Sequence, residues 1–299
     1  MSDYHLHLHP HVGLGEESDP PQGVYPTGHI EAYVESAAAR GVTELGFTEH
    51  LYRCVEAAPV LGRFWEHPDT PDDVAALSQA MVEADLTLSL DDYVETVVRA
   101  KDAGLPVKLG LEVDFFPETI DAVGELLEPY PWDYLIGSVH WIGGWAIDAS
   151  HSVFEFERRG IETAWDQYFA LETQLAESGV VDVLAHVDVI KKYGLRPDTD
   201  PEDWYRQVVD AAAASGTAVE VSSQGLRNPA KEVYPAPDFL RMFRESDVPI
   251  TLASDAHRSS EAAWGHDEVV RAARAAGYDT HLRFDTRRST LVPLPVVDS

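Results

Sequence analysis

Histidine and acidic residues recur at the ends of short apolar runs along this chain. The first run carries Asp3-Tyr4-His5-Leu6-His7, and alternation along a strand places His5 and His7 on the same face. Two neutral imidazoles on one face can chelate a divalent cation. A single His-x-His pair is a weak signal, so the interpretation depends on whether other runs end in the same way.

Five further runs also end in residues that bind metals. They finish in Gly46-Phe47-Thr48-Glu49-His50, Gly110-Leu111-Glu112, Gly137-Ser138-Val139-His140, Leu184-Ala185-His186 and Ser254-Asp255-Ala256-His257. Each of these residues alone has an ordinary structural explanation, either a hydrogen-bonded core histidine or a carboxylate that caps a turn. The same chemistry at so many run ends favours one shared metal site.

The residue types define the kind of metal centre. Imidazole with carboxylate suits zinc, manganese or iron, whereas a structural zinc site or an iron–sulfur cluster needs several cysteines. Cys54 is the only cysteine, and we expect it to be a buried or half-buried residue without a catalytic role. The ligands outnumber what one ion binds. The sequence therefore predicts a cluster of two or three divalent ions, bridged by a carboxylate such as Glu112.

The run ends belong to an alternating series of strands and helices, which is typical of an α/β protein with a parallel sheet. We predict strands at 2–8, 44–49, 107–112, 133–139, 181–185, 217–221 and 249–253. Helical periodicity follows at 28–40, 90–103, 118–129, 160–178, 202–215, 236–245 and 260–276.

An open doubly wound sheet has the same alternation, but it would spread the carboxyl ends of its strands along an edge. A closed barrel gathers them on one rim, where such barrels place their active sites. Convergence of the ligands therefore predicts a distorted (βα)7 TIM-like barrel. We expect one domain over residues 1–299, with an insertion at about 51–88 after the second strand.

Composition narrows the functional classes. Lys and Arg number 22 against 52 Asp and Glu, a net charge of −30. A surface this negative disfavours nucleic acid and anionic membranes as partners. We find no membrane span and no signal peptide, and so expect a cytoplasmic protein. Of the 13 histidines, those outside the run ends, such as His67, His151, His266 and His281, are interpreted as surface residues.

The order of the six motifs resembles that of the PHP (polymerase and histidinol phosphatase) superfamily over nearly the whole chain. Within it, the chain is most similar to the monofunctional histidinol-phosphatase group. Three segments carry this second resemblance: Glu220-Val221-Ser222-Ser223-Gln224-Gly225-Leu226-Arg227, Val233-Tyr234-Pro235, and Arg287-Arg288-Ser289-Thr290 before Leu291-Val292-Pro293-Leu294.

The resemblance implies a set of ligands for each of up to three ions. His5, His7, Glu112 and Asp255 would hold the first ion, and Glu112, His140 and His186 the second. The third would be held by His50, His257 and one residue of the loop after the first strand. Family members supply a His or Asp there, whereas this chain offers His9 and His11, with Gly13 where some relatives have an acid. We favour His11.

The resemblance also implies a reaction, the hydrolysis of a small phosphomonoester, with L-histidinol phosphate converted to L-histidinol and phosphate. A hydroxide bridging the metals would attack phosphorus, and Asp255 or His257 would protonate the leaving alkoxide. Arginine grips phosphate in a planar two-point contact. Arg227 is the first candidate for this contact and Arg53 the second, while Trp141 and Tyr234 are candidate walls of the substrate pocket.

Three other functions compete with this one. A nucleotide phosphoesterase or exonuclease on the same barrel is disfavoured by the acidic surface. An amidohydrolase also begins with His-x-His and ends with Asp, but it would normally want a bridging Lys or an acid on the fourth strand and would not need His257 beside Asp255. A non-catalytic barrel would have no reason to keep six ligand positions.

Overall fold

Short parallel strands line the centre of the protein, whose residues 1–296 are described by a computed structural model. The strands form two runs, here meaning groups of hydrogen-bonded neighbours. One run contains β1 (Ser2–Leu6), β2 (Glu44–Phe47) and β3 (Val107–Leu109). The other contains, in spatial order, β10 (Ile250–Ala253), β9 (Ala218–Ser222), β8 (Val183–Leu184), β5 (Ile136–Ser138) and β4 (Glu112–Asp114). Every pair of neighbours in the two runs is parallel.

Backbone contacts join the two runs into a ring. β3 and β4 are the two halves of one predicted strand, interrupted at Gly110-Leu111, and Glu112 N–H donates to Glu49 C=O at 3.0 Å. On the other side Leu6 bridges to Ala256, and His7 N–H donates to Ala256 C=O at 2.7 Å. The predicted distorted barrel is confirmed, with β3 and β4 counted as one strand.

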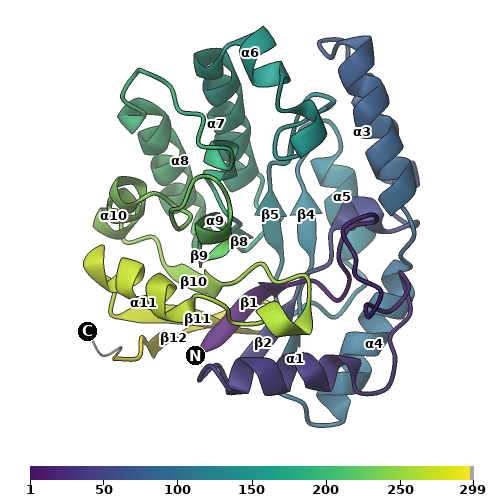
Figure 1. Ribbon diagram of the computed structural model, residues 1–299. Helices are drawn as coiled ribbons and strands as arrows, with labels where there is room; N and C mark the ends of the chain where they lie inside the picture. Colours follow the sequence, from purple (N-terminus) through teal and green to yellow (C-terminus); the bar gives the residue numbers. More distant parts are fainter. Residues whose placement is uncertain (297–299) are drawn as a thin grey trace.

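Helices surround this ring (Figure 1). They are α1 (His29–Ala38), α4 (Leu90–Asp102), α5 (Ile120–Leu127), α7 (Ile161–Glu177), α8 (Glu202–Ser215), α10 (Pro237–Glu245) and α11 (His266–Ala275). The predicted helices are thus all present. The last begins later than expected, because Ser259–Glu261 forms a separate 3₁₀ turn, η5. Ser89 caps α4 by accepting a hydrogen bond from Asp92 N–H at 3.2 Å.

The segment 51–88 is largely helical, which the sequence analysis did not predict. It contains η1 (Leu51–Arg53), α2 (Ala58–Leu61), η2 (Phe64–Glu66) and the long α3 (Asp72–Asp85). The buried face of α3 is made by Val74, Ser78, Val82 and Asp85. Two of these four residues are polar, so the apolar periodicity that identifies a helix is weak there.

Several short elements lie between the main helices and strands on the carboxyl side of the barrel. They are the antiparallel pair β6 (Trp141–Ile142) and β7 (Trp145–Ala146), η3 (Ser150–Ser152), α6 (Glu155–Arg159), η4 (Val189–Lys191) and α9 (Gln224–Arg227). Their lengths, from two to five residues, are too short to show a hydrophobic period in the sequence.

An antiparallel hairpin of β11 (Thr280–Asp285) and β12 (Arg288–Pro293) closes the amino end of the barrel. Leu282 and Phe284 pack there against Tyr4 and Tyr134 in a separate buried apolar cluster. The Tyr134 ring lies against the barrel backbone. A Cβ atom at Gly46 would stand only 2.0 Å from the Tyr134 hydroxyl, so this position requires glycine.

Two histidines interpreted as surface residues are buried instead. His266 is 2% exposed and its Nε2 contacts Ser2 C=O at 3.1 Å, while His281 is 1% exposed on β11. Both lie at the amino end, where the hairpin and α11 cover β1 (Figure 1). The prediction was wrong because His266 begins α11 with its ring against β1, and His281 lies on a hairpin strand that packs against the barrel.

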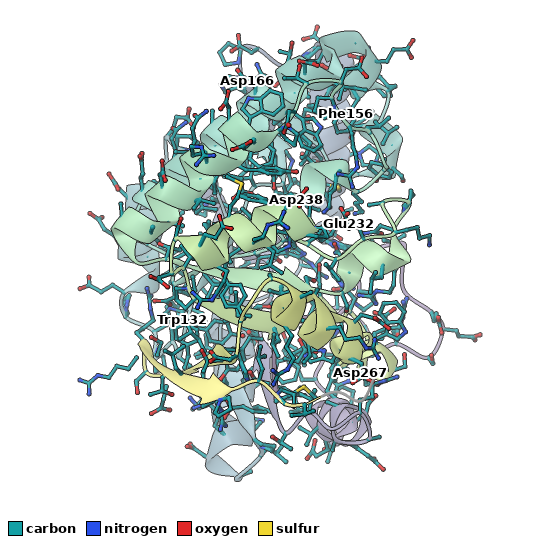
Figure 2. All side chains as sticks on the ribbon, turned by 90° about the vertical axis from the view of Figure 1, so that its left-hand side faces the viewer. Trp132, Phe156, Asp166, Glu232, Asp238 and Asp267 are labelled. Atoms are coloured by element: carbon teal, nitrogen blue, oxygen red, sulfur yellow. The ribbon has the colours of Figure 1, made fainter. Side chains whose placement is uncertain are left out.

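The acidic surplus lies on the outer layer. Figure 2 labels Asp166, Asp238 and Asp267, which come from α7, α10 and α11 and are exposed. Cys54 is buried, as predicted, and its thiol lies 3.6 Å from His50 C=O. Within residues 1–296, none of the helices combines the length and the apolar character needed to span a bilayer.

Candidate metal centre

Glu112 lies at the centre of the predicted ligands. Its Oε2 is 2.8 Å from His50 Nδ1, 3.2 Å from His5 Nε2 and 3.4 Å from His7 Nε2. Its Oε1 is 3.0 Å from His186 Nε2 and 3.4 Å from His140 Nε2. Each carboxylate oxygen therefore faces a different set of imidazoles, which is how a carboxylate bridging two cations is arranged.

A second carboxylate approaches the first histidine pair from β10. Asp255 Oδ1 is 3.4 Å from His7 Nε2 and 3.6 Å from His5 Nε2. The two imidazole Nε2 atoms are 3.1 Å apart, close to the edge of about 3.3 Å expected between ligands at tetrahedral zinc. This agreement supports a shared ion for the three side chains.

The ligand atoms form four overlapping groups, each within 4.8 Å. The groups are His7, His50 and His257; His5, His7 and Asp255; His5, Glu112 and His186; and His50, Glu112 and His140. These groups differ from the family-based expectation in several respects. His140 and His186 fall into separate groups, each with Glu112, and His7 also joins His50 and His257. Glu112 is absent from the group of His5, His7 and Asp255, and His11 is in none of the four groups.

Several of these buried atoms have no hydrogen-bond partner within residues 1–296. They include His50 Nε2, Glu112 Oε2, Asp255 Oδ1 and His257 Nε2. Burying a polar atom without a partner costs free energy of folding. A group of such atoms in one place therefore needs an explanation. Divalent cations supply it, since nitrogen and carboxylate oxygen are the ligands that zinc, manganese and iron accept. The residues fit such ions.

A layer of carboxylates behind the histidines was missed by the sequence analysis. Glu220 Oε2 is 2.8 Å from His5 Nδ1, Asp114 Oδ1 is 2.9 Å from His140 Nδ1, and Asp85 Oδ2 is 2.8 Å from His11 Nδ1. Such contacts fix the ring orientation and the nitrogen that carries the proton. The signal for two of them was present: Asp114 lies two residues after Glu112, and Glu220 lies at the end of a predicted strand.

Backbone strain marks two ligands. Asp255 has φ +51° and His186 has φ +22°, in the region that non-glycine residues rarely adopt. Both follow the last residue of their strands, β10 and β8, by two positions. The strained backbone redirects these side chains from the course of the strand toward the centre.

Burial and neighbouring charges move the pKa values of the ligands in different directions. Burial lowers the pKa of His50 to about 3, which keeps its imidazole neutral. Burial alone would lower that of His140, but the carboxylates of Glu112 and Asp114 raise it to about 9. Although burial opposes it, the surrounding histidines hold the pKa of Glu112 well below its usual value. Ionised carboxylate beside imidazole is the state that binds cations.

The loop after β1 brings His11, not His9, to the ligands. The His11 ring centroid is 5.0 Å from that of His50 and 5.1 Å from that of His257. His9 packs between Tyr25 and His29 instead, and burial lowers its pKa to about 4. His11 Nδ1 contacts Asp85 Oδ2 at 2.8 Å, so Nε2 is the ring nitrogen that this contact leaves available.

The two candidate arginines lie in different environments. Arg227 is 25% exposed, and its guanidinium carbon lies 5.4 Å from the centre of the Trp264 ring. It lines a cavity beside the histidines and donates a hydrogen bond to Asp255 C=O at 3.0 Å. Arg53 is fully buried and donates to His9 and Pro10 C=O, both at 3.1 Å. Its position contradicts the prediction that it binds phosphate, because η1 turns its side chain into the core, where it holds the loop after β1.

Two adjoining cavities open at the metal centre. One of about 290 Å³ is lined by Arg227, Asp255 and His257, and we call it the phosphate cavity. The other, of about 410 Å³, is lined by Tyr52, Trp141 and Tyr193, and we call it the aromatic cavity. Lys192, which the sequence analysis missed, lines both. Trp141, a candidate wall of the substrate pocket, lines the aromatic cavity. Tyr234 is fully buried and does not line either cavity.

Comparisons with known proteins agree with these features. The PHP domain family matches residues 5–224. A protein from Deinococcus radiodurans described as a probable histidinol-phosphatase is 33% identical over 93% of this chain and 94% of its own length. The histidinol-phosphatase of Lactococcus lactis is 22% identical, covering 86% of this chain and 85% of its own.

A crystal structure from Lactococcus lactis shares the fold. It is a histidinol phosphate phosphatase in complex with zinc, L-histidinol and phosphate, and it aligns with a TM-score of 0.71 at 20% identity. The alignment covers 97% of this chain and 98% of that protein.

Proposed function

Because this chain belongs to the PHP domain family, we propose that it is a metal-dependent phosphatase that hydrolyses L-histidinol phosphate to L-histidinol and phosphate. The observation that carries the proposal is the position of Glu112, whose two oxygens face separate groups of imidazoles beside a cavity with Arg227 and Lys192. Two or three divalent ions, with zinc the first candidate, would be held by the groups described above. When bound, they supply Lewis-acid charge and acidify the attacking water.

Arg227 and Lys192 bind the phosphate group in this proposal. The guanidinium of Arg227 is fixed by Ser254 C=O at 2.7 Å and by Glu261 Oε2 at 3.2 Å. A fixed guanidinium costs little conformational entropy when it binds an anion. Lys192 and Arg258 add further positive charges, which offset the carboxylates of Asp148, Asp255 and Glu261 in the same walls, whereas the whole protein carries a net charge of −30.

In this proposal Asp255 carries the proton that the leaving alkoxide receives. His257 Nδ1 lies 3.3 Å from Asp255 C=O, so its proton is held there and Nε2 presents a lone pair. A lone pair suits a metal ligand better than an acid. The Asp255 carboxylate, oriented by Gln224, is placed to accept the proton of the attacking water and return it to the alcohol oxygen.

The test is a comparison of metal-free and reconstituted protein. We expect the metal-free protein to be inactive, and zinc, manganese or iron to restore hydrolysis of L-histidinol phosphate with release of inorganic phosphate. A panel of other phosphorylated metabolites measures selectivity. Equal activity of metal-free protein would overturn the mechanism, and preference for a nucleotide or a cyclic amide would overturn the substrate.

We further propose that the chain works as one catalytic domain in the cytoplasm, without nucleic acid as a partner. The continuous ring of strands supports the first point, and the exposed acidic residues of the outer helices, such as Asp166, Asp238 and Asp267 labelled in Figure 2, support the last. A long polyanion meets the whole surface, whereas a small phosphate ester meets mainly the local charges of the cavity.

A further inference from the structure

The boundary between the two cavities contains one carboxylate with a free oxygen. Asp148 lines both the phosphate cavity and the aromatic cavity. Lys192 Nζ donates to its Oδ2 at 3.1 Å and to its C=O at 2.9 Å. Its Oδ1 accepts no hydrogen bond from residues 1–296, and the side chain is 26% exposed. Asp148 therefore offers an acceptor to whatever occupies the cavities.

Two other carboxylates of these walls are less suited to bind a group at the boundary. Asp85 uses both of its oxygens, since it accepts from Val12 N–H at 2.7 Å through Oδ1 and from Tyr52 Oη at 2.8 Å through Oδ2. Glu261 accepts from His257 N–H at 3.1 Å and pairs with Arg227 at 3.2 Å, both through Oε2, while its Oε1 is 4.0 Å from Arg258 Nη1. Glu261 lines the phosphate cavity but not the aromatic cavity, whereas Asp148 lines both.

Asp148 is also held in place and ionised. Tyr193 Oη donates to its C=O at 2.6 Å, which fixes the backbone beside the cavity. Burial alone would raise the pKa of Asp148, but Lys192 and His140 hold it below its usual value. The side chain of Asp148 has one hydrogen-bond contact, from Lys192 Nζ to Oδ2. A partly buried carboxylate of this kind can bind a further cation through its other oxygen.

We propose that Asp148 Oδ1 binds the ammonium group of the substrate and makes the enzyme selective for phosphate esters of amino alcohols. The inference rests on the proposed function and specifies its substrate class. In L-histidinol phosphate the ammonium lies on the carbon between the phosphate-bearing methylene and the imidazole-bearing methylene. With phosphate near Arg227 and the ring near Tyr52 and Trp141, the ammonium falls at the boundary where Asp148 lies.

A substrate without the ammonium would cover Asp148 Oδ1 and give it no partner, while Oδ2 keeps its contact with Lys192 Nζ. A site built around a buried polar group rejects an analogue that lacks the matching group far more strongly than an apolar pocket rejects a smaller one. The selectivity should therefore appear in kcat/KM and depend on the charge of Asp148.

The test uses zinc-reconstituted protein and two esters, L-histidinol phosphate and the imidazolyl-propyl phosphate that lacks only the amino group. We expect wild-type kcat/KM to favour the amino ester by roughly 100-fold. In Asp148→Asn the ratio falls to about one, because the amino ester alone loses a charged partner, whereas any change at Lys192 acts on the phosphate group that both esters share. Asp210→Asn, the same change at an exposed position on α8, is the matched control and keeps the wild-type ratio.

Three outcomes would overturn the proposal. If wild-type protein hydrolyses both esters equally, Asp148 does not bind the ammonium, whether or not the variant folds, and the proposed function survives. If Asp148→Asn slows both esters by the same factor, Asp148 only positions Lys192. If wild-type protein hydrolyses neither ester, the proposed function fails together with the inference.

Discussion

The two ends of the barrel treat buried polar groups in opposite ways, although the same strands reach both. At the amino end, Tyr4 of β1 donates to Glu44 of β2, and Arg283 of the hairpin pairs with the same carboxylate. At the carboxyl end, His7 lies beside Glu112 and Asp255, whose Oε2 and Oδ1 have no hydrogen-bond partner within residues 1–296.

The amino end therefore contributes mainly to folding, and the carboxyl end to the binding of ions. The amino end is closed by the hairpin at the lower left of Figure 1, where Tyr4, Glu44 and Arg283 pair with one another, although His266 Nδ1 has no hydrogen-bond partner within residues 1–296. The carboxyl end leaves nitrogen and oxygen ligands for ions that the protein must acquire. A site of this kind costs stability until it is filled, and binding then returns that stability. Each prediction below changes one end and measures stability, metal binding or activity.

The largest effect is expected from Asp255→Asn at the carboxyl end. Metal content should fall, and kcat/KM with it by at least roughly 1000-fold, because a charged ligand and proton carrier is lost. Asn tolerates the left-handed backbone at this position, where φ is +51°. Unfolding of the metal-free protein should change by less than about 1 kcal/mol, since Oδ1 has no hydrogen bond to lose.

Metal analysis, phosphate release and urea unfolding of the same preparation check this prediction. Metal-free wild-type protein is the control, and it should be as inactive as the variant. Retention of full metal content with full activity would show that Asp255 is not a ligand.

The next effect concerns the other end. Phe284→Ala removes a buried ring that packs with Tyr4 and Tyr134 at centroid distances of 6.1 and 5.5 Å. It should lower the free energy of unfolding by about 3–5 kcal/mol, the usual cost of such a cavity. Below the unfolding transition kcat/KM should stay at the wild-type value. A loss of activity in protein that is still folded would show that the two ends are coupled.

The same contrast explains what the sequence could predict. Ligands such as His140 and His186 were identified because each is a titratable residue at the end of an apolar strand, and periodicity marks that place. The hairpin was not identified because β12 is exposed along most of its length and has no apolar period to read.

Side-chain direction at the rim was harder to predict. Arg53 lies three residues after His50, which suggested the rim, but the 3₁₀ turn at Leu51–Arg53 directs it into the core. Lys192 follows another such turn, η4, and reaches both cavities from it. Sequence spacing does not encode the direction of side chains in such turns.

A subtler change at the carboxyl end is Glu220→Gln. Glu220 orients His5 through a 2.8 Å contact and also accepts from His186 N–H at 3.3 Å. Loss of its charge should weaken zinc binding by about 10–100-fold, the usual effect of replacing a group behind a ligand. Competition with a chelator measures this affinity. Glu44→Gln, an equally buried carboxylate at the amino end, is the matched control and should leave zinc affinity unchanged.

The smallest effect is a pH dependence at the amino end. Burial lowers the pKa of His281 to about 4, whereas an unfolded histidine titrates near 6.5. The unfolded chain therefore binds a proton that the folded protein refuses, so this residue's contribution to stability is present above pH 6.5 and lost as the pH falls toward 4. Between pH 7.5 and 5.5 the loss should be about 1 kcal/mol. Urea unfolding at both pH values should show it in wild type and in His151→Gln, an exposed control, and show less of it in His281→Gln. An unchanged pH dependence in His281→Gln would mean that the amino end, despite its burial, admits the proton.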